Sequence, residues 1–305
     1  MANTTYGYSK AISLTDYLPA FRQKEKEQLW DWGKLCTKKT TKRATEQVFS
    51  FSGLPAANQI KELEPMVYYD MHELDATTFT VAKYGLGTMF SYELLNDNLH
   101  LPDLLEEAGD AMGESHAYIK AQSACAPFNR AFNSSYRVDP NTASIPLCSD
   151  SHVTKSGDTF DNDLGTLTLT WDNLWSAVNH FETTLLSQSG LYLMDTPKYL
   201  LYHPSLEKDV RAILESSQVP GTADNDKNTL KGMGITPVSS RFLTSTYWFL
   251  IGSRFKRDFL FFDREGGVKK AMKDDFDRMG TKVRTFQRFV FGVRDFPYIV
   301  GAQTA

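Results

Sequence analysis

The longest helical pattern along the chain begins at the segment LPDLLEEAGDAM and continues to about Ala124. Its apolar residues recur near helical spacing, at Leu101, Leu104, Leu105, Ala108, Ala111 and Met112. Pro102 suits the first turn of a helix, and the acidic residues that follow it suit the positive N-terminal end. The pattern predicts one helix of roughly 35 Å at 1.5 Å per residue. If the helix continued to Phe132, we would expect a bend near Pro127.

Shorter apolar patterns alternate between helix and strand in the middle of the chain. A second helical stripe is formed by Leu174, Val178, Phe181 and Leu185. Thr170 is the expected N-cap of this helix, and Gly190 is the expected cap at its other end. The segment SLEKDVRAILESS predicts a third helix, capped by Ser205, while PKYLLY, GITPV and TYWFLIG predict strands. This middle third therefore indicates a compact α/β unit.

Strand-like composition dominates two other parts of the chain. Between residues 46 and 95, the runs QVFSFSGLP, MVYYDM and TTFTVAKYG are rich in Val, Thr and aromatic residues and predict an extended hairpin or meander. This part has few core positions of its own, so we expect it to rest on another domain or another subunit. Near the C-terminus, DFLFFD, KVRTFQRFVFGV and PYIVG predict further strands.

The long strand KVRTFQRFVFGV carries basic residues at alternating positions. Lys282, Arg284 and Arg288 have the same parity, so strand alternation places them on one face. A half-buried strand with a charged outer face would show this pattern, and a strand that stacks nucleic-acid bases could show it too. We regard these three residues as candidate inter-subunit contacts that bind acidic groups on a neighbouring subunit.

Composition narrows the class of protein. The chain has 305 residues, of which 41% are hydrophobic and 23% are charged, as in ordinary globular proteins. No window approaches 18 consecutive apolar residues and the N-terminus does not resemble a signal peptide, so we expect no membrane partner and a protein used inside a cell. The net charge of −4 argues against a broad basic surface dedicated to nucleic acid, although it allows the protein to enclose nucleic acid.

The stretch IPLCSDSHVTKSGDTFDNDLG is the main candidate for chemistry, because Cys148, Asp150 and His152 stand at alternate positions. A catalytic zinc site needs three protein ligands, and a nucleophilic Cys needs an oriented His. Cys148 and His152 are four residues apart, so in a strand they would lie about 13 Å from each other, too far for the His to act on the Cys. The Asp-rich end of the stretch does not match a calcium-binding EF-hand loop. Because the 3 Cys form no CxxC motif and no catalytic motif occurs elsewhere, we expect no disulfide, no cofactor, no metal and no enzymatic activity.

Two long passages resemble a known family. AFNSSYRVDPNTASIPLCSDSH and the residues after it, up to the helix that ends in NHF, resemble the major capsid proteins of tailed phages, of the Mu-like head-subunit type. Downstream, PKYLLYHPSLEKDV, the loop VPGTADNDKN and the strand WFLIG resemble the same proteins in the same order. The similarity extends over about residues 40 to 300.

The resemblance implies an α+β chain with the Hong Kong 97-type capsid fold. Residues 1–40 would form an N-terminal arm, and residues 41–95 an extended β loop that lies over a neighbouring subunit. Residues 96–165 would form a peripheral domain with a long spine helix, followed by an axial α/β domain at 166–262. Residues 263–305 would return to the sheet of the peripheral domain.

The resemblance also implies a structural function. The chain would assemble with itself into hexamers and pentamers of an icosahedral head that encloses double-stranded DNA, with scaffolding, portal and decoration proteins as partners. It would be assembled in the host cytoplasm and would end in the virion. Two alternatives remain open: a metal-dependent hydrolase that uses Cys148, Asp150 and His152, and another virion protein such as a tail-tube or decoration subunit.

Overall fold

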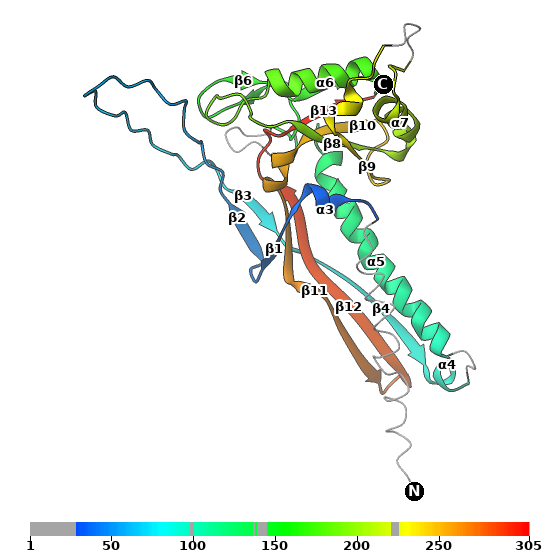
Figure 1. The fold of residues 1–305 in the computed structure, drawn as a ribbon. Coiled ribbons are helices and arrows are strands. Elements are labelled where there is room, and N and C mark those ends of the chain that lie inside the picture. The colour runs from blue at the N-terminus through cyan, green and yellow to red at the C-terminus, as the bar shows by residue number, and fades with distance from the viewer. Residues whose placement is uncertain (1–28, 98–100, 137, 139–144, 221–225, 305) are drawn as a thin grey trace.

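The computed structural model describes residues 29–97, 101–136, 138, 145–220 and 226–304. Figure 1 shows a compact part at one end of the molecule and an elongated part that extends from it. A hairpin protrudes sideways from the place where the two parts meet. Residues 1–28, most of the predicted N-terminal arm, lie outside the described residues.

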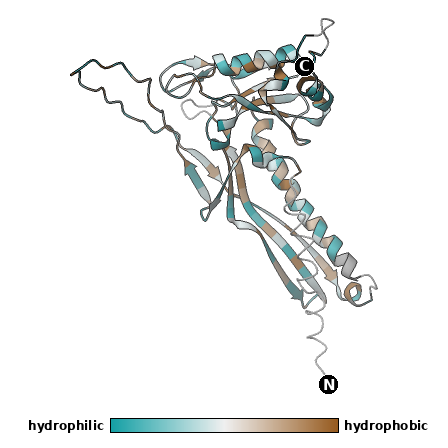
Figure 2. Cartoon of the chain, in the orientation of Figure 1, coloured by the Kyte–Doolittle hydropathy of each residue, from teal (hydrophilic) through white to brown (hydrophobic). Residues whose placement is uncertain are grey.

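The elongated part is built on a four-stranded sheet, the long sheet. Its strands, in spatial order, are β1 (Thr37–Thr41), β11 (Phe259–Asp275), β12 (Gly280–Val293) and β4 (Ala82–Ser91). β1 runs parallel to β11, and the other neighbours are antiparallel. Burial alternates strictly along β12, so one face of the strand is covered and the other is open. Figure 2 shows the corresponding mixture of hydrophobic and hydrophilic residues on the long strands.

One helix covers the buried face of the long sheet. This helix, α5 (Leu101–Asn129), follows the short helix α4 (Tyr92–Asp97), and the short helix α3 (Trp32–Leu35) packs nearby. His116 Nε2 on α5 lies 2.8 Å from Thr285 Oγ1 on β12. The expected helix end near Ala124 is wrong, because α5 continues through Pro127. Its last turns are held by buried packing, since the ring of Phe128 contacts Phe249 and Phe259.

The compact part contains a five-stranded sheet. Its strands, in spatial order, are β7 (Asp163–Thr166), β13 (Ile299–Gln303), β10 (Tyr247–Gly252), β8 (Pro197–Tyr202) and β9 (Thr236–Ser239). β10 pairs antiparallel with β8 and β13, while β7 and β9 add in parallel at the edges. Trp248, Phe249, Leu250 and Ile251 of the central strand are fully buried. Such a continuous apolar run requires cover on both faces of the sheet.

Helices supply that cover. The α-helices of the compact part are α6 (Trp171–Thr183) and α7 (Glu207–Glu215), and its 3-10 turns are η1 (Pro204–Leu206), η2 (Leu230–Met233) and η3 (Ser253–Arg257). Thr170 caps α6 by accepting from the amide of Asn173, as its sequence predicts. The other two predicted caps are wrong. His203 accepts at the start of the η1 turn in place of Ser205, and α6 ends well before Gly190.

The protruding hairpin begins with β2 (Thr45–Val48) and β3 (Thr77–Thr80), which pair antiparallel. Beyond them the two arms are joined by an isolated bridge between Phe51 and Glu73. The strand predicted at MVYYDM does not form, although Val and the aromatic residues in this run are typical of strands. Among the strands that the structure describes, none lies beside that run to complete a hydrogen-bond ladder.

Strand pairing also corrects the segment boundaries expected from the sequence. β4 lies within residues 41–95 but belongs to the long sheet, where it pairs with β12. β13 lies within residues 263–305, yet it pairs with β10 in the five-stranded sheet rather than returning to the long sheet. The cause is burial: Ile299, Val300 and Ala302 are fully buried, and only a central position in the compact part provides that.

Candidate functional site

The structure buries two of the three residues of the candidate chemical site and leaves the third exposed. His152, on the short strand β5 (His152–Val153), is fully buried and its ring stacks on Phe296 at a centroid distance of 3.9 Å. Cys148 is buried against β13, where a Cβ at Gly301 would lie 2.7 Å from the Cys148 sulfur. Asp150 is exposed. The His and Cys side chains are therefore part of the packed core.

The thiols and the acidic residues do not support a metal site or a nucleophilic Cys. Burial raises the pKa of the Cys148 thiol well above its ordinary value, and it raises the pKa of Cys36 to about 11 and that of Cys125 to about 12. Neutral thiols of this kind are poor nucleophiles and poor metal ligands. Among the residues that the structure describes, no three His, Cys, Asp or Glu side chains are grouped so that they could hold a metal ion.

Instead, the stretch is organised around Asn162, which the sequence did not single out. Asn162 is fully buried and sits between β6 (Thr159–Phe160) and β7. Its Oδ1 accepts from the amide of Ser149 at 2.8 Å, and its Nδ2 donates to the Leu147 carbonyl at 2.9 Å. Its own carbonyl accepts from the amide of Gly301 at 2.9 Å. Through its side chain and its main-chain carbonyl, Asn162 thus ties the stretch from Ile145 to Gly165 to the five-stranded sheet.

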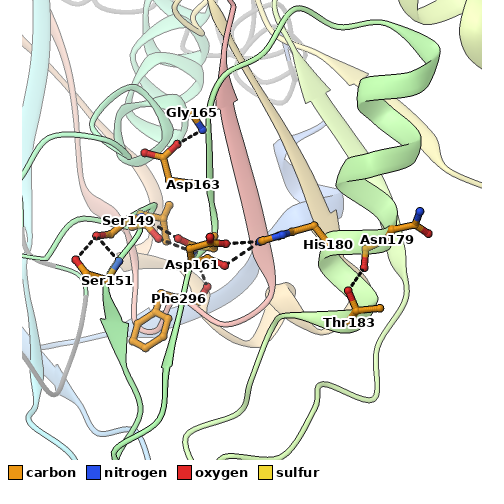
Figure 3. Close-up of polar contacts among 11 residues, drawn as sticks. Ser149, Ser151, Asp161, Asp163, Gly165, Asn179, His180, Thr183 and Phe296 are labelled. Carbon is orange, nitrogen blue, oxygen red and sulfur yellow. Dashed lines mark hydrogen bonds and ion pairs between the residues drawn. The ribbon is translucent and has the colours of Figure 1, made fainter.

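The neighbouring acidic residues also serve the loop. Figure 3 shows Asp161 turned toward His180 of α6, with His180 Nε2 2.5 Å from Asp161 Oδ1. Asp163 Oδ1 accepts from the amide of Gly165 at 2.8 Å and forms a tight turn. Burial, followed by the charges of Asp150 and Asp161, raises the pKa of Asp163. These contacts close turns and fix α6 against the loop.

The predicted basic residues do lie together. Lys282, Arg284 and Arg288 are on the open face of β12, opposite the face that α5 covers. Antiparallel register brings further basic residues of the two neighbouring strands to the same face: Arg264, Lys269 and Lys273 lie near them on β11, and Lys83 on β4. We call this surface the basic face. Within it, Lys282 forms an ion pair with Asp275.

A groove of about 810 Å³ runs along the basic face. Its lining includes small residues at Gly87 and Ala271, the apolar side chain of Met89, and the charged side chains of Lys273 and Arg284. Directly paired positions in the register place Gly87 opposite Arg284, and Met89 opposite Lys282. The groove therefore combines an apolar floor with cationic walls.

The second notable surface is the protruding loop, residues 53–73. Every residue from Gly53 to Glu73 is exposed. The apolar members of the loop are Leu54, Ile60, Leu63, Met66, Val67, Tyr68, Tyr69 and Met71. Leu63 is 100% exposed and Tyr68 is 88% exposed. Many large apolar residues exposed on one loop are typical of a site of protein contact. The basic face and the protruding loop are therefore candidate surfaces for contact between subunits.

Comparison with solved structures places the whole architecture among shell-forming proteins. A chain in the capsid structure of the cyanophage P-SCSP1u matches with a TM-score of 0.61 and 14% identity, covering 90% of this chain and 88% of that one. A chain of the bacteriophage PhiM1 mature capsid matches at 0.58 and 9%, covering 90% and 86%. A virus-like particle from Pyrococcus furiosus matches at 0.56 and 8%, covering 95% and 99%. The fold is therefore the Hong Kong 97-type capsid fold.

The sequence matches a family model that agrees with the fold, whereas a search of curated proteins returns no significant match. Among the described residues, no helix has the length and apolar character needed to cross a membrane. The finer placement among Mu-like head subunits stays a prediction. The family model described as phage capsid protein matches residues 75–301, most of the chain, so the chain belongs to the phage capsid protein family and is a structural protein of the virion shell.

Proposed function

We propose that this chain is the major, non-enzymatic subunit that closes a phage head by repeating in hexamers and pentamers around double-stranded DNA. The observation that carries the proposal is the protruding loop, residues 53–73, whose large apolar residues are all exposed. A shell grows by heterologous contacts that close into rings, and such contacts need a surface that the subunit cannot satisfy by itself.

Each part of the chain has a proposed role in the shell. We assign residues 1–40 to an arm, residues 41–95 to the extended β loop and the strand that follows it, and residues 166–262 to an axial domain whose loops meet at the ring centres. Residues 96–165 and 263–305 would form the rest of the peripheral domain, except for β7 and β13, which belong to the five-stranded sheet. The unbroken helix α5 along the long sheet supports a stiff peripheral domain.

The proposed partners follow from the same role. Besides its own copies, the subunit would meet scaffolding, portal and decoration proteins during assembly in the host cytoplasm. It would enclose DNA without reading its sequence. The net charge of −4 supports this, because an acidic chain does not clamp the packaged polyanion.

Electron microscopy of the purified full-length protein tests the proposal. We expect negative-stain images to show shells, tubes or capsomer rings, either with the protein alone or after co-expression with the scaffolding protein of the same phage. Monomers of uniform size under every condition, scaffold included, would contradict it.

A further inference from the structure

We propose that the buried carboxyl pair Asp258 and Asp295 is a proton-dependent latch, which fixes the protruding hairpin to the compact part in acid and releases it as pH rises. The proposal concerns the isolated subunit and does not rest on the proposed function. It adds a conformational control that a shell-forming role does not by itself contain.

The pair lies where the long strands enter the compact part. Asp258 directly precedes β11, and Asp295 lies just after β12. Both residues are buried. Arg294 donates to Asp258 Oδ1 from its Nε at 3.0 Å and also from its Nη2, and the Arg294 amide donates to the Asp258 carbonyl at 2.8 Å. The cluster therefore joins the ends of two neighbouring strands at one point.

The two carboxyls differ in their partners. Asp258 faces the guanidinium of Arg294, whereas Asp295 Oδ1 accepts from two neutral donors, Gln188 Nε2 at 3.0 Å and the Phe296 amide at 2.9 Å. Neutral donors offset the burial of a carboxylate less than a guanidinium does. Burial, and then the charge of Asp258, raises the pKa of Asp295 to about 7. Asp295 is therefore the group that changes its charge near neutral pH.

Other charged groups surround the pair. Burial raises the pKa of Asp258, and the charges of Arg294 and Arg257 oppose that shift. These cations keep Asp258 easier to ionise than Asp295, so the shared site holds its proton on Asp295. The remaining titratable groups close to Asp258 are Tyr298, Arg254 and Asp195, which interact with one another beside η3.

Both arms of the hairpin rest on residues next to the pair. In one arm, the Thr77 hydroxyl donates to the Arg294 carbonyl at 3.2 Å. In the other, a Cβ at Gly53 would lie 3.4 Å from Ser189 Oγ, and Ser189 directly follows Gln188, the donor to the latch. Figure 1 shows the hairpin leaving the molecule at this junction. A change at the carboxyl pair therefore reaches the base of both arms.

Ionisation of Asp295 works against the closed junction. Two buried carboxylates then share the guanidinium of Arg294, and like charges at short range repel each other. Opening the junction admits water to both carboxylates. The closed state holds the proton more tightly than the open state, so it is favoured below the raised pKa and loses that advantage as pH rises through it. The hairpin should be released above about pH 7.

Distance measurements across the junction test the latch. Gln47 on β2 and Lys208 on α7 are exposed, and the three natural Cys residues are buried, so the variant Q47C/K208C accepts one spin label on each side. Double electron–electron resonance of the unassembled subunit should give a narrow distance distribution at pH 5 and one about twice as broad at pH 8. An unchanged distribution over this range would overturn the proposal.

Two substitutions in the labelled protein change the latch in different ways. Asp295→Asn keeps the acceptor oxygen and removes the charge, so the distribution should stay narrow at pH 8. Arg294→Gln removes the cation that favours ionised carboxyls, so the broadening should move upward by about one pH unit. Asp150→Asn, on an exposed side chain, is the matched control and should behave as the parent protein.

Circular dichroism checks that each variant folds. If Asp295→Asn does not fold, the pH series of the parent protein and of Arg294→Gln still decide the question. Broadening of the Asp295→Asn variant at pH 8 would overturn the latch, and so would a shift in Arg294→Gln that is absent or downward. Because every measurement uses the unassembled subunit, failure of the latch leaves the proposed function intact.

Discussion

The compact part and the protruding loop use the same kinds of residues in opposite ways. In β10, Leu250 and its neighbours are fully buried and supply the core of the subunit. In the loop, Leu63 and the aromatic pair Tyr68 and Tyr69 are exposed. The first region is complete within one chain. The second leaves its apolar side chains available for contact with another molecule.

The two regions contribute differently to the free energy of folding of the isolated subunit. Burial of apolar area in the compact part stabilises the isolated subunit by roughly 25 cal/mol per Å². The loop contributes almost nothing to that stability, because its side chains stay in water in the folded subunit. Its apolar area is left for the contact between subunits, so mutations in the two regions should affect different measurements.

The largest contrast should come from a matched pair of Leu substitutions. Leu250→Ala should lower the free energy of unfolding by about 4 kcal/mol, because it leaves a cavity in the packed sheet. Leu63→Ala should change it by less than about 0.5 kcal/mol. Urea denaturation of the unassembled subunit measures both values. An equal loss in the two variants would show that the loop packs within its own chain in solution.

The stretch from Ile145 to Gly165 offers a second contrast, between Asn162 and Asp150. Asn162→Leu should destabilise the subunit by about 3 kcal/mol, because the Ser149 amide and the Leu147 carbonyl would lose their buried partner. Asp150→Ala, on an exposed side chain of the same stretch, should stay within about 0.5 kcal/mol. Thermal melts of the two variants are sufficient. A large effect at Asp150 alone would reopen the question of a site there.

A further effect is expected from pH at the junction of the two parts. Burial raises the pKa of Asp258 to about 6, even though Arg294 donates to it. Burial and the nearby Asp258 charge raise the pKa of Asp295 to about 7. Because both pKa values are raised in the folded state, the folded protein binds these protons more tightly than the unfolded chain. The stabilisation is therefore full in acid and is lost as pH rises through 6 to 7.

The expected loss between pH 5 and pH 8 is on the order of 4 kcal/mol. Urea denaturation at a series of pH values measures it. Asp295→Asn should flatten the slope, because the amide oxygen can still accept from Gln188 Nε2 and from the Phe296 amide without carrying a charge. Asp150→Asn is the matched control and should leave the slope unchanged. A profile that rises with pH in the parent protein would contradict this account.

Local pattern predicted much of the fold correctly. Thr170 caps α6, and the parity of Lys282, Arg284 and Arg288 places them together, because caps and strand alternation depend on residues close in sequence. Helix ends were less predictable. α5 continues through Pro127 because buried contacts of Phe128 outweigh the bond that the proline removes.

Long-range contacts decided the rest. Asn162 gave no signal beyond its place among turn-forming residues, since its partners at Ser149, Leu147 and Gly301 are brought to it only by folding. The placement of β13 in the five-stranded sheet was also hidden, because a short apolar run fits either sheet until its neighbours are known.

The sequence by itself determined the family, the main helices and strands, and the common face of the basic residues. Each of these depends on spacing along the chain. Only the tertiary structure decided that Cys148 and His152 are core residues, that the basic face contains an open groove, and that the described part of the chain leaves the loop exposed. These properties depend on which distant segments pack together, and the free energy of burial that selects the packing is shared by the whole fold.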